Sequence, residues 1–483
     1  MKLIQFSMKS SWATIEVRFE LASNRCTSGR RLRRSRNSRR SSSMTWVSAA
    51  VRRQLRSLRI SRGDVRAFAS HGADVNVRDV ASLGACKIGP DGMKNGNWRF
   101  PYQEHTLKQS VALPPEVYAA REVFEIEKQT LWRNAWQFVT HESELLPSED
   151  EASTESSTFK TFELLGYPLV AVRDGRSKTY SAFHNVCRHR AGPLEWPGSA
   201  GCLGQHGLRC KYHGWMYDLN GQLRAAPNFG DAAGFRKSDY PLLRVDMEQF
   251  RGFLLMRLIG AAAAESASVG HSAKSSFRDQ YRDLVAYVAE LSLERFKLHG
   301  HTSHHVACNW KVMAENYLEG YHIPTIHPAL SKEMGGSLDH YEVKVHDGFV
   351  THHIKSDTSM AHTGLWVYIW PNAAINMYKS GLSLERWIPV DEKNMRVEYL
   401  NFFDETASSE EISAAQAGTG TLTQEDANIC EAVQQNLNSS GVYSAGRLSP
   451  RHEMGVHYFQ SLYRANVPME SVYASSSTVR AEA

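Results

Sequence analysis

Apolar positions divide the chain into a helical start, a run of short strands and a mixed second half. After Pro114-Pro115, apolar residues recur at helical spacing over 117–136, and proline is common where a helix begins. An N-terminal helical segment is therefore expected at 110–136. β-Like runs separated by Asp-Gly and Asn-Gly turns follow, and the expected strands are 158–165, 168–173, 179–185 and 252–258. These strands predict a small all-β domain at about 136–260.

The second half of the chain mixes both periodicities. Helical patterns cover 278–293 and, late in the chain, 424–438. Strand-like runs are expected at 341–354, 364–370, 374–378 and 395–403. The fold class is therefore α+β, with a second domain at 276–470. Residues 261–275 have the low complexity of a linker, and the Ser-rich residues 471–483 are expected to form a flexible tail.

The start of the chain differs in composition from the rest. Residues 1–63 hold only two acids, and Arg and Ser dominate 30–43. From Met44, apolar residues recur at helical spacing between arginines, which is typical of an organelle transit peptide, so 1–95 is expected to be disordered and is excluded from fold reasoning. A nuclear-type signal, a nucleic-acid-binding arm and mistranslated sequence before Met44 remain alternatives. The dominance of Arg favours the mitochondrial matrix over the chloroplast stroma.

Bulk composition excludes several functional classes. The net charge is +5, and most of the excess lies in the first 63 residues, so the remainder does not predict a nucleic-acid surface. No stretch approaches the roughly 18 uninterrupted apolar residues of a membrane-spanning helix. Seven scattered cysteines do not resemble a disulfide framework. They indicate a reduced compartment in which some thiols bind metal.

Two Cys–His pairs form the strongest chemical signal. Cys187 and His189 are separated by one residue, and Cys210 and His213 follow in a second pair after a gap of twenty residues. Pairs on separate loops of a β-domain suit a [2Fe-2S] cluster in which the two cysteines bind one iron and the two histidines the other. A Cys2His2 zinc site is the alternative, but zinc fingers place both cysteines before both histidines.

A second constellation lies further along the chain. Asn316, Glu319 and His322 are spaced by three and would share one face of a helix. His327 follows five residues after His322, and Pro324 is expected to break the helix and return His327 to the same point. Two imidazoles and one carboxylate form the facial triad of non-haem Fe(II) oxygenases.

The sequence leaves the carboxylate of this triad open. Glu425, Asp426 and Glu431 in the late helix are candidates. Each of them can also be a solvated acid near a helix N-terminus, where the helix dipole favours negative charge. Position alone does not choose among the three.

Together, the two constellations resemble the alpha subunit of a Rieske non-haem iron oxygenase over about residues 110–465. The narrower resemblance is to the choline monooxygenase-like branch, which includes carnitine and glycine-betaine oxygenases. It rests on Asn-Val-Cys-Arg-His-Arg at 185–190, Glu-Asn-Tyr-Leu-Glu-Gly-Tyr-His at 315–322, Trp-Pro-Asn at 370–372 and Gln434. At Gly320-Tyr321 the chain lacks an additional glycine of the plant choline monooxygenases, so it is more similar to bacterial-type members.

The resemblance implies a fold and a set of partners. It implies an all-β Rieske domain and a helix-grip (START-like) antiparallel sheet with a long C-terminal helix. Its cofactors would be a [2Fe-2S] cluster and a mononuclear Fe(II). It makes Asp426 the third iron ligand and Glu319 a catalytic bridge to a cluster histidine of a neighbouring subunit in a homotrimer, with Asn316 also catalytic. A ferredoxin or a flavin/iron-sulfur reductase would supply electrons.

The predicted reaction is the O2-dependent hydroxylation of a small quaternary amine. Choline, converted to betaine aldehyde hydrate for glycine betaine biosynthesis, is the first choice. The alternatives are oxygenation or demethylation of glycine betaine or carnitine, aromatic-ring hydroxylation, and a non-enzymatic Rieske electron-transfer role. Aromatic faces can bind a cation that has no N–H group. The substrate-binding candidates, which could instead fill the core, are Tyr317, Trp366, Tyr368, Trp370 and Tyr378.

Overall fold

The computed structural model describes most of the chain after its first hundred residues. The described ranges are 104–147, 155–205, 207–258, 275–354, 364–378, 381–439, 441–444 and 446–472. The predicted transit-like segment, residues 261–274 of the predicted linker and residues 473–483 of the predicted tail lie outside these ranges. Within the described ranges, no helix combines the length and the apolar character that a bilayer crossing requires.

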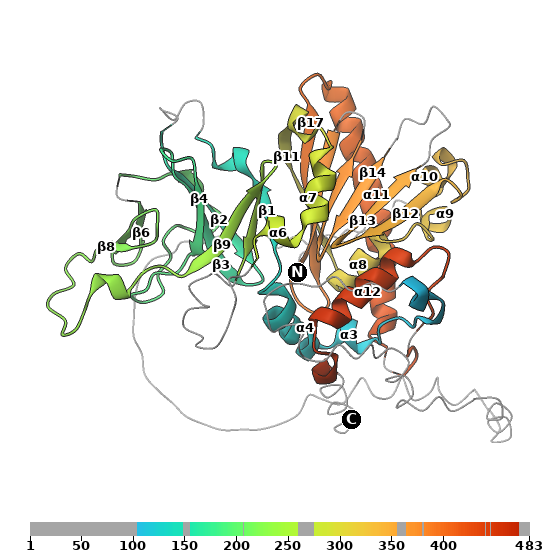
Figure 1. Ribbon diagram of the computed structural model, residues 1–483, viewed down its shortest axis with the longest axis horizontal. Helices are drawn as coiled ribbons and strands as arrows, with labels where there is room; N and C mark the ends of the chain where they lie inside the picture. Colours follow the sequence, from blue (N-terminus) through green and yellow to red (C-terminus); the bar gives the residue numbers. More distant parts are fainter. Residues whose placement is uncertain are drawn as a thin grey trace, which may run out of the picture. The chain divides into compact units, whose positions relative to one another are not determined.

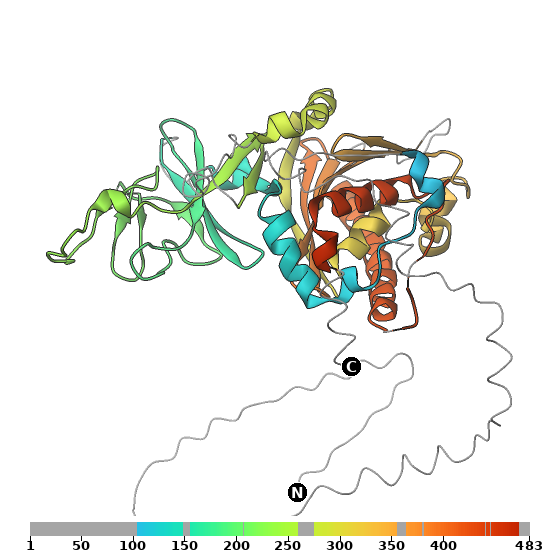
Figure 2. The same cartoon turned by 60° about the horizontal axis from the view of Figure 1, so that its bottom comes forward.

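The amino-terminal helical segment consists of short pieces. These are η2 (Glu104–Gln109), α3 (Glu116–Ala119), α4 (Arg121–Glu127) and the π-helical turn η3 (Lys128–Trp132). The prediction of one helix over 117–136 is wrong in this respect. Ala120 has an extended backbone (φ −88°, ψ 129°) and separates α3 from α4. Figure 1 and Figure 2 both show the cyan helix α4 beside the red helix α12 (Met454–Asn466).

The first seven-stranded sheet of the described chain is antiparallel, in the order β1-β10-β9-β4-β3-β2-β5. In that order its strands are Gln137–His141, Phe253–Arg257, Arg244–Phe250, Tyr180–His184, Tyr167–Arg173, Thr158–Leu164 and Ala200–Cys202. A smaller sheet contains β6 (Leu208–Arg209), β7 (Met216–Tyr217) and β8 (Leu223–Ala225). The 3-10 turns η4 (Glu142–Leu145) and η5 (Lys237–Asp239) lie in the same part of the chain. The four strands expected here agree with β2, β3, β4 and β10.

A second antiparallel sheet follows, in the order β11-β17-β16-β15-β14-β13-β12. In that order its strands are Phe296–Val306, Met395–Asp404, Gly381–Pro389, Ala373–Met377, Leu365–Ile369, Phe349–Ile354 and Tyr341–His346. The expected run at 341–354 is therefore two strands. Strands β11 and β16 were not predicted. Together the two sheets and their helices confirm the α+β class.

The helices of this second part differ widely in length. They are α6 (Phe277–Gln280), α7 (Arg282–Ala289), η6 (Leu293–Arg295), α8 (Trp310–Tyr317), α9 (Ile323–Ile326), α10 (Pro328–Glu333), α11 (Ser409–Leu437) and α12. The late helix α11 begins fifteen residues before the predicted 424–438, at a capping box formed by Ser408 and Glu411. Its first half buries few side chains, so the apolar periodicity that predicts helices is weak there.

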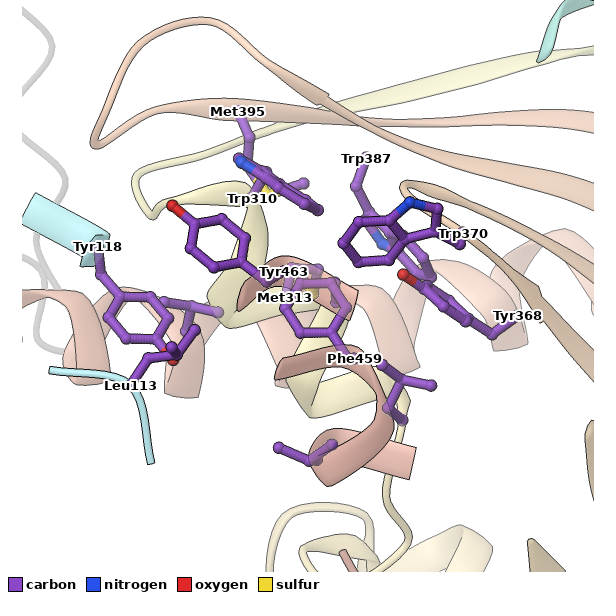
Figure 3. Packing of buried hydrophobic residues seen from close by; sticks show 14 of the residues in the cluster. Leu113, Tyr118, Trp310, Met313, Tyr368, Trp370, Trp387, Met395, Phe459 and Tyr463 are labelled. Carbon is purple, nitrogen blue, oxygen red and sulfur yellow. The ribbon is translucent and has the colours of Figure 1, made fainter. Parts of the chain in front are cut away.

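The second sheet has a core on each face. One core contains α8 and α12 residues with Tyr368 and Trp387 of the sheet and with Trp370 in the turn after β14 (Figure 3). The other contains Leu382 and Leu384 together with side chains of α6, α7, β1 and β10. Side chains of a strand alternate between faces, so the odd-numbered positions of β16 face the α8 side. All nine residues of β16 are buried.

Candidate metal centres

The two Cys–His loops repeat one backbone pattern. The N–H of Cys187 and that of Cys210 each donate to the carbonyl five residues later, at 2.9 and 2.8 Å. The carbonyl of each cysteine accepts from the N–H four residues later, at 3.1 and 3.0 Å. The backbone there is left-handed in both loops, with φ 53° at Ala191 and 74° at Gly214. Each loop therefore presents its cysteine in the same geometry.

The side chains of the two loops meet as expected for a shared metal group. The thiols of Cys187 and Cys210 are buried and neither is in a disulfide. The ring centroids of His189 and His213 are 4.6 Å apart, and the buried Nδ1 atom of His189 has no partner among the described atoms. A Cβ atom on Gly192 would lie 3.0 Å from the sulfur of Cys210. The donors and this close approach fit a [2Fe-2S] cluster between the loops.

Two aromatic residues, Tyr217 and Trp215, support this centre. The Tyr217 hydroxyl lies 3.2 Å from the sulfur of Cys187 and accepts from the N–H of Arg188 at 3.2 Å. Trp215 stacks on His189, with centroids 4.9 Å apart and planes 7° apart. Hydrogen bonds to the sulfur atoms of an iron-sulfur cluster tune the reduction potential of that cluster. Tyr217 lies in a two-residue strand, which gives no sequence signal for this contact.

The second constellation brings His322, His327 and Asp426 together. Their ligand atoms lie within 4.8 Å of one another. Oδ1 of Asp426 is 3.0 Å from Nε2 of His327 and 3.6 Å from Nε2 of His322. Two imidazoles and one carboxylate with open positions match a non-haem Fe(II) site.

Two further carboxylates contact the Nδ1 atoms of the imidazole rings, whose Nε2 atoms lie near Asp426. Glu319 Oε1 lies 2.7 Å from Nδ1 of His322, and Glu425 Oε2 lies 2.7 Å from Nδ1 of His327. A carboxylate on Nδ1 fixes the tautomer and directs the Nε2 lone pair to the metal. Burial lowers the pKa of His327, but Asp426 and Glu425 outweigh it and raise the pKa. Three carboxylates around two imidazoles make an anionic site suited to a cation.

The geometry distinguishes the three candidate carboxylates. Asp426 faces both histidines, whereas Glu425 contacts His327 only at its outer nitrogen. Glu431 accepts instead from the backbone N–H of Ala307 at 2.9 Å. Asn316 lies beside the site as expected, because its side-chain amide donates to Oδ1 of Asp426 at 2.8 Å.

The expected common helix face is wrong. Helix α8 ends at Tyr317, before Glu319 and His322. The Glu319 carboxylate accepts from the backbone N–H groups of Tyr321 and His322, and this local bonding replaces the helical pattern. Pro324 does not end a helix, but lies in the first turn of the short α9, where its missing N–H has no cost.

A buried acidic group with aromatic partners lies on the sheet face toward α8, and the sequence did not reveal it. We call it the Glu385 cluster, and its members are Tyr317, Asn376, Glu385, Trp387 and Tyr399. The Tyr317 hydroxyl donates to Oδ1 of Asn376 at 2.7 Å. The Glu385 carboxylate accepts from Asn376 Nδ2 at 3.0 Å, Trp387 Nε1 at 3.0 Å and the Tyr399 hydroxyl at 3.1 Å.

The predicted aromatic substrate residues lie in three places. Tyr317 belongs to the Glu385 cluster, and the rings of Trp366 and Tyr378 lie against each other with centroids 6.3 Å apart. Tyr368 and Trp370 are fully buried and pack on Phe459 of α12 (Figure 3). The structure therefore places these last two in the core.

Comparisons with known proteins match the two parts of the chain separately. Residues 135–236 match the Rieske [2Fe-2S] domain, and residues 293–364 and 354–469 match the ring hydroxylating alpha subunit (catalytic domain). The carnitine monooxygenase oxygenase subunit of Escherichia coli (strain K12) is 28% identical over 378 residues, covering 74% of this chain and 93% of that protein. The chloroplastic choline monooxygenase of Arabidopsis thaliana is 24% identical over 385 residues, covering 75% and 84%.

Solved structures have the same fold. The quaternary ammonium Rieske monooxygenase CntA in complex with L-carnitine superposes with a TM-score of 0.62 at 22% identity, covering 75% of this chain and 97% of that chain. Naphthalene 1,2-dioxygenase from Rhodococcus sp. bound to indole superposes with a TM-score of 0.58 at 17% identity, covering 77% and 97%. The expected pairing of a β-rich domain with a helix-grip sheet is confirmed.

Proposed function

From the premise that this chain belongs to the Rieske non-haem iron oxygenases, with a [2Fe-2S] cluster and a mononuclear iron as cofactors, we propose that it hydroxylates a small quaternary amine. Two relatives that cover about three quarters of the chain, a carnitine and a choline monooxygenase, support this substrate class. The main support within the chain is the Glu385 cluster, which combines aromatic rings with a buried carboxylate. Choline and carnitine are the two substrates to be tested first.

The chain's own residues have distinct roles in this proposal. Cys187, Cys210 and the two loop histidines hold the cluster, and His322, His327 and Asp426 hold the iron. When bound, the cluster stores electrons and the iron activates O2. Glu319 and Glu425 keep Nδ1 of the two iron histidines engaged, so that both Nε2 atoms stay available. Asn316 holds one oxygen of Asp426 in place.

Electron supply requires partners. We propose a ferredoxin or a flavin/iron-sulfur reductase as the donor, and a homotrimer in which Glu319 connects the iron site to a cluster histidine of the next subunit. The exposure of His213 and Tyr212 at a loop tip supports this, since another protein can reach them there. Cross-linking and analytical ultracentrifugation of the purified protein would test the trimer.

A mitochondrial location is proposed from the Arg-rich start of the chain alone. The test is a full-length chain with a carboxyl-terminal fluorescent tag. Replacing the arginines of residues 30–40 and 52–62 with glutamine should abolish import. A tag that co-localises with plastids would contradict the mitochondrial assignment.

The activity test uses anaerobically purified protein with NADH and a generic reductase. O2 consumption and products are followed with choline, carnitine, glycine betaine and an aromatic acid. Turnover of one quaternary amine, lost in Asp426→Ala and kept in Glu410→Ala, is the expected result. Glu410 is an exposed acid in the first turn of the same helix α11, so it controls for charge. Turnover of the aromatic acid alone would favour ring hydroxylation and refute the amine proposal.

A further inference from the structure

We propose that Glu385 is the specificity residue that selects a quaternary ammonium group, by serving as its counter-ion beside the iron site. This inference rests on the proposed function and names the residue that would recognise the substrate. It concerns a strand, β16, that carries none of the expected metal or substrate residues.

The first argument is the set of partners around the carboxylate. Glu385 is 7% exposed, and its partners are the amide of Asn376, the indole of Trp387 and the phenol of Tyr399. All three donate hydrogen bonds and none carries a positive charge. When Glu385 is ionised, the fold supplies no positive hydrogen-bond partner for its charge, so a bound cation would stabilise the ionised form.

The second argument is the chemistry of a quaternary ammonium ion. Such a cation has no N–H group, so it cannot satisfy the lone pairs of a buried carboxylate. The carboxylate that binds it must therefore receive its hydrogen bonds from elsewhere, as Glu385 does on both oxygens. The cation itself is stabilised by negative charge and by aromatic faces. Tyr317, which is only partly buried, supplies such a ring, and the fully buried Trp387 packs against it with centroids 4.9 Å apart.

The third argument is the connection of this cluster to the iron residues. Tyr317 directly follows Asn316, whose amide holds Asp426. The hydroxyl of Tyr399 lies 2.8 Å from that of Thr423, one helical turn before Asp426 on α11. Helices α8 and α11 therefore connect the Glu385 cluster to the iron site from two directions. Burial raises the pKa of Glu385 to about 7, and the negative charge of Asp426 contributes to this rise. The two carboxylates therefore interact electrostatically.

The test compares a cation with its neutral isostere. Choline and 3,3-dimethylbutan-1-ol have the same shape, but carbon replaces the charged nitrogen in the second. Equilibrium binding to the anaerobic holoprotein would be measured by calorimetry, so the readout does not depend on turnover. We expect wild type to bind choline at least about tenfold more tightly than the alcohol, and Glu385→Gln to lose that preference while binding the alcohol unchanged. Carnitine would be run as a second cation.

Control variants and outcomes separate the inference from the proposed function. Glu405→Gln removes an exposed carboxylate near the end of β17 and should leave the preference intact, since the Glu405 side chain is 72% exposed. Unchanged choline affinity in a folded, iron-loaded Glu385→Gln protein would overturn the inference alone. Wild-type protein that binds neither cation would overturn both claims. If Glu385→Gln does not fold, equal binding of choline and the alcohol by wild type would overturn the inference, and a tenfold preference would support it.

Discussion

Glu127 and Glu385 are buried carboxylates whose aromatic partners belong to the same hydrophobic core. Among the described residues, each has three hydrogen-bond partners, and the two sets differ in one member. Glu127 accepts from the indole of Trp310 at 3.0 Å and from the phenol of Tyr463 at 2.7 Å. Glu385 accepts from an indole and a phenol in the same way. The third partner of Glu127 is the ammonium of Lys311 at 2.6 Å, with both side chains 0% exposed. The third partner of Glu385 is a neutral amide.

This difference distinguishes a structural ion pair from a site prepared for a ligand. Burial lowers the pKa of Lys311, and Glu127 opposes that effect. The pair is neutral as a unit and joins the amino-terminal segment to α8. Glu385 has no such counter-charge among its hydrogen-bond partners, so its ionised form costs free energy until a cation arrives. Figure 3 shows Trp310 and Tyr463, partners of Glu127, in the same hydrophobic cluster as Trp387, a partner of Glu385. The two carboxylates can therefore be compared in similar surroundings.

The largest expected effect is on Lys311→Met, which breaks the complete pair. Glu127 would be left buried and unpaired, so we expect unfolding to become easier by about 3–5 kcal/mol. Urea denaturation at pH 7.5 measures this. Adding Glu127→Gln to the same chain should restore most of the loss. A single variant within about 1 kcal/mol of wild type would show that the pair is not structural.

A third carboxylate, Glu315, tests the effect of burial with neutral donors. It accepts from the Tyr118 hydroxyl at 2.8 Å and from Gln460 at 3.1 Å, and burial raises its pKa to about 7. The folded state therefore holds its proton more tightly than the unfolded state, so wild-type stability falls as the pH rises from about 4.5 to 7. Glu315→Gln should reduce this fall by about 1–3 kcal/mol. Melting curves from pH 4.5 to 8 measure it, and parallel curves for both proteins would contradict the assignment.

A smaller effect on folding is expected for Glu385→Gln. No ion pair is broken and the amide oxygen can still accept from Trp387 and Tyr399, but the donor Asn376 loses its acceptor, so the free energy of unfolding should fall by about 1–2 kcal/mol. Denaturation under the conditions used for Lys311→Met gives a direct comparison. A loss of about 3 kcal/mol or more would make Glu385 a structural residue like Glu127.

The smallest effect is expected for Lys128→Met. Lys128 Nζ lies 2.7 Å from Glu125, but the two side chains are 23% and 46% exposed. Exposed pairs contribute about 0–1 kcal/mol, and this variant should lose no more than that. It therefore serves as the baseline for the Lys311→Met measurement. A larger loss would mean that removing any lysine from this segment perturbs the fold.

The sequence pointed to residues that the structure brings together at the two candidate metal centres, but it did not point to the Glu385 cluster. Closely spaced Cys and His residues have few structural explanations, so the histidines of both centres could be located directly. Asp426 required the family resemblance, because three acids of one helix were equivalent until the structure placed only one between the histidines. The position of Glu319 likewise could not be predicted from local spacing. Its carboxylate bonds to nearby backbone N–H groups and so ends the helical pattern that the sequence suggested.

Glu385 was missed for a physical reason. In β16, Leu382 and Leu384 alternate with Ser383 and Glu385, a pattern that normally marks a strand with one face in solvent. Here α8 covers the polar face of β16, and all of it is buried. Covering of a polar face by helices distant in sequence is a tertiary effect that local periodicity does not record. The fold class could be predicted, but this site could not.

The register of β16 and β17 has a consequence for protein engineering. Glu385 is paired with Tyr399, and Ser383 with Asn401, whereas the intervening pair Leu384 and Leu400 belongs to the opposite core. A directed-evolution library aimed at bulkier amines can therefore randomise Ser383 and Asn401 as a pair, with the leucines kept constant. Variants from such a library would change the side chains beside Glu385 while the packing on the other side of the sheet stays as it is.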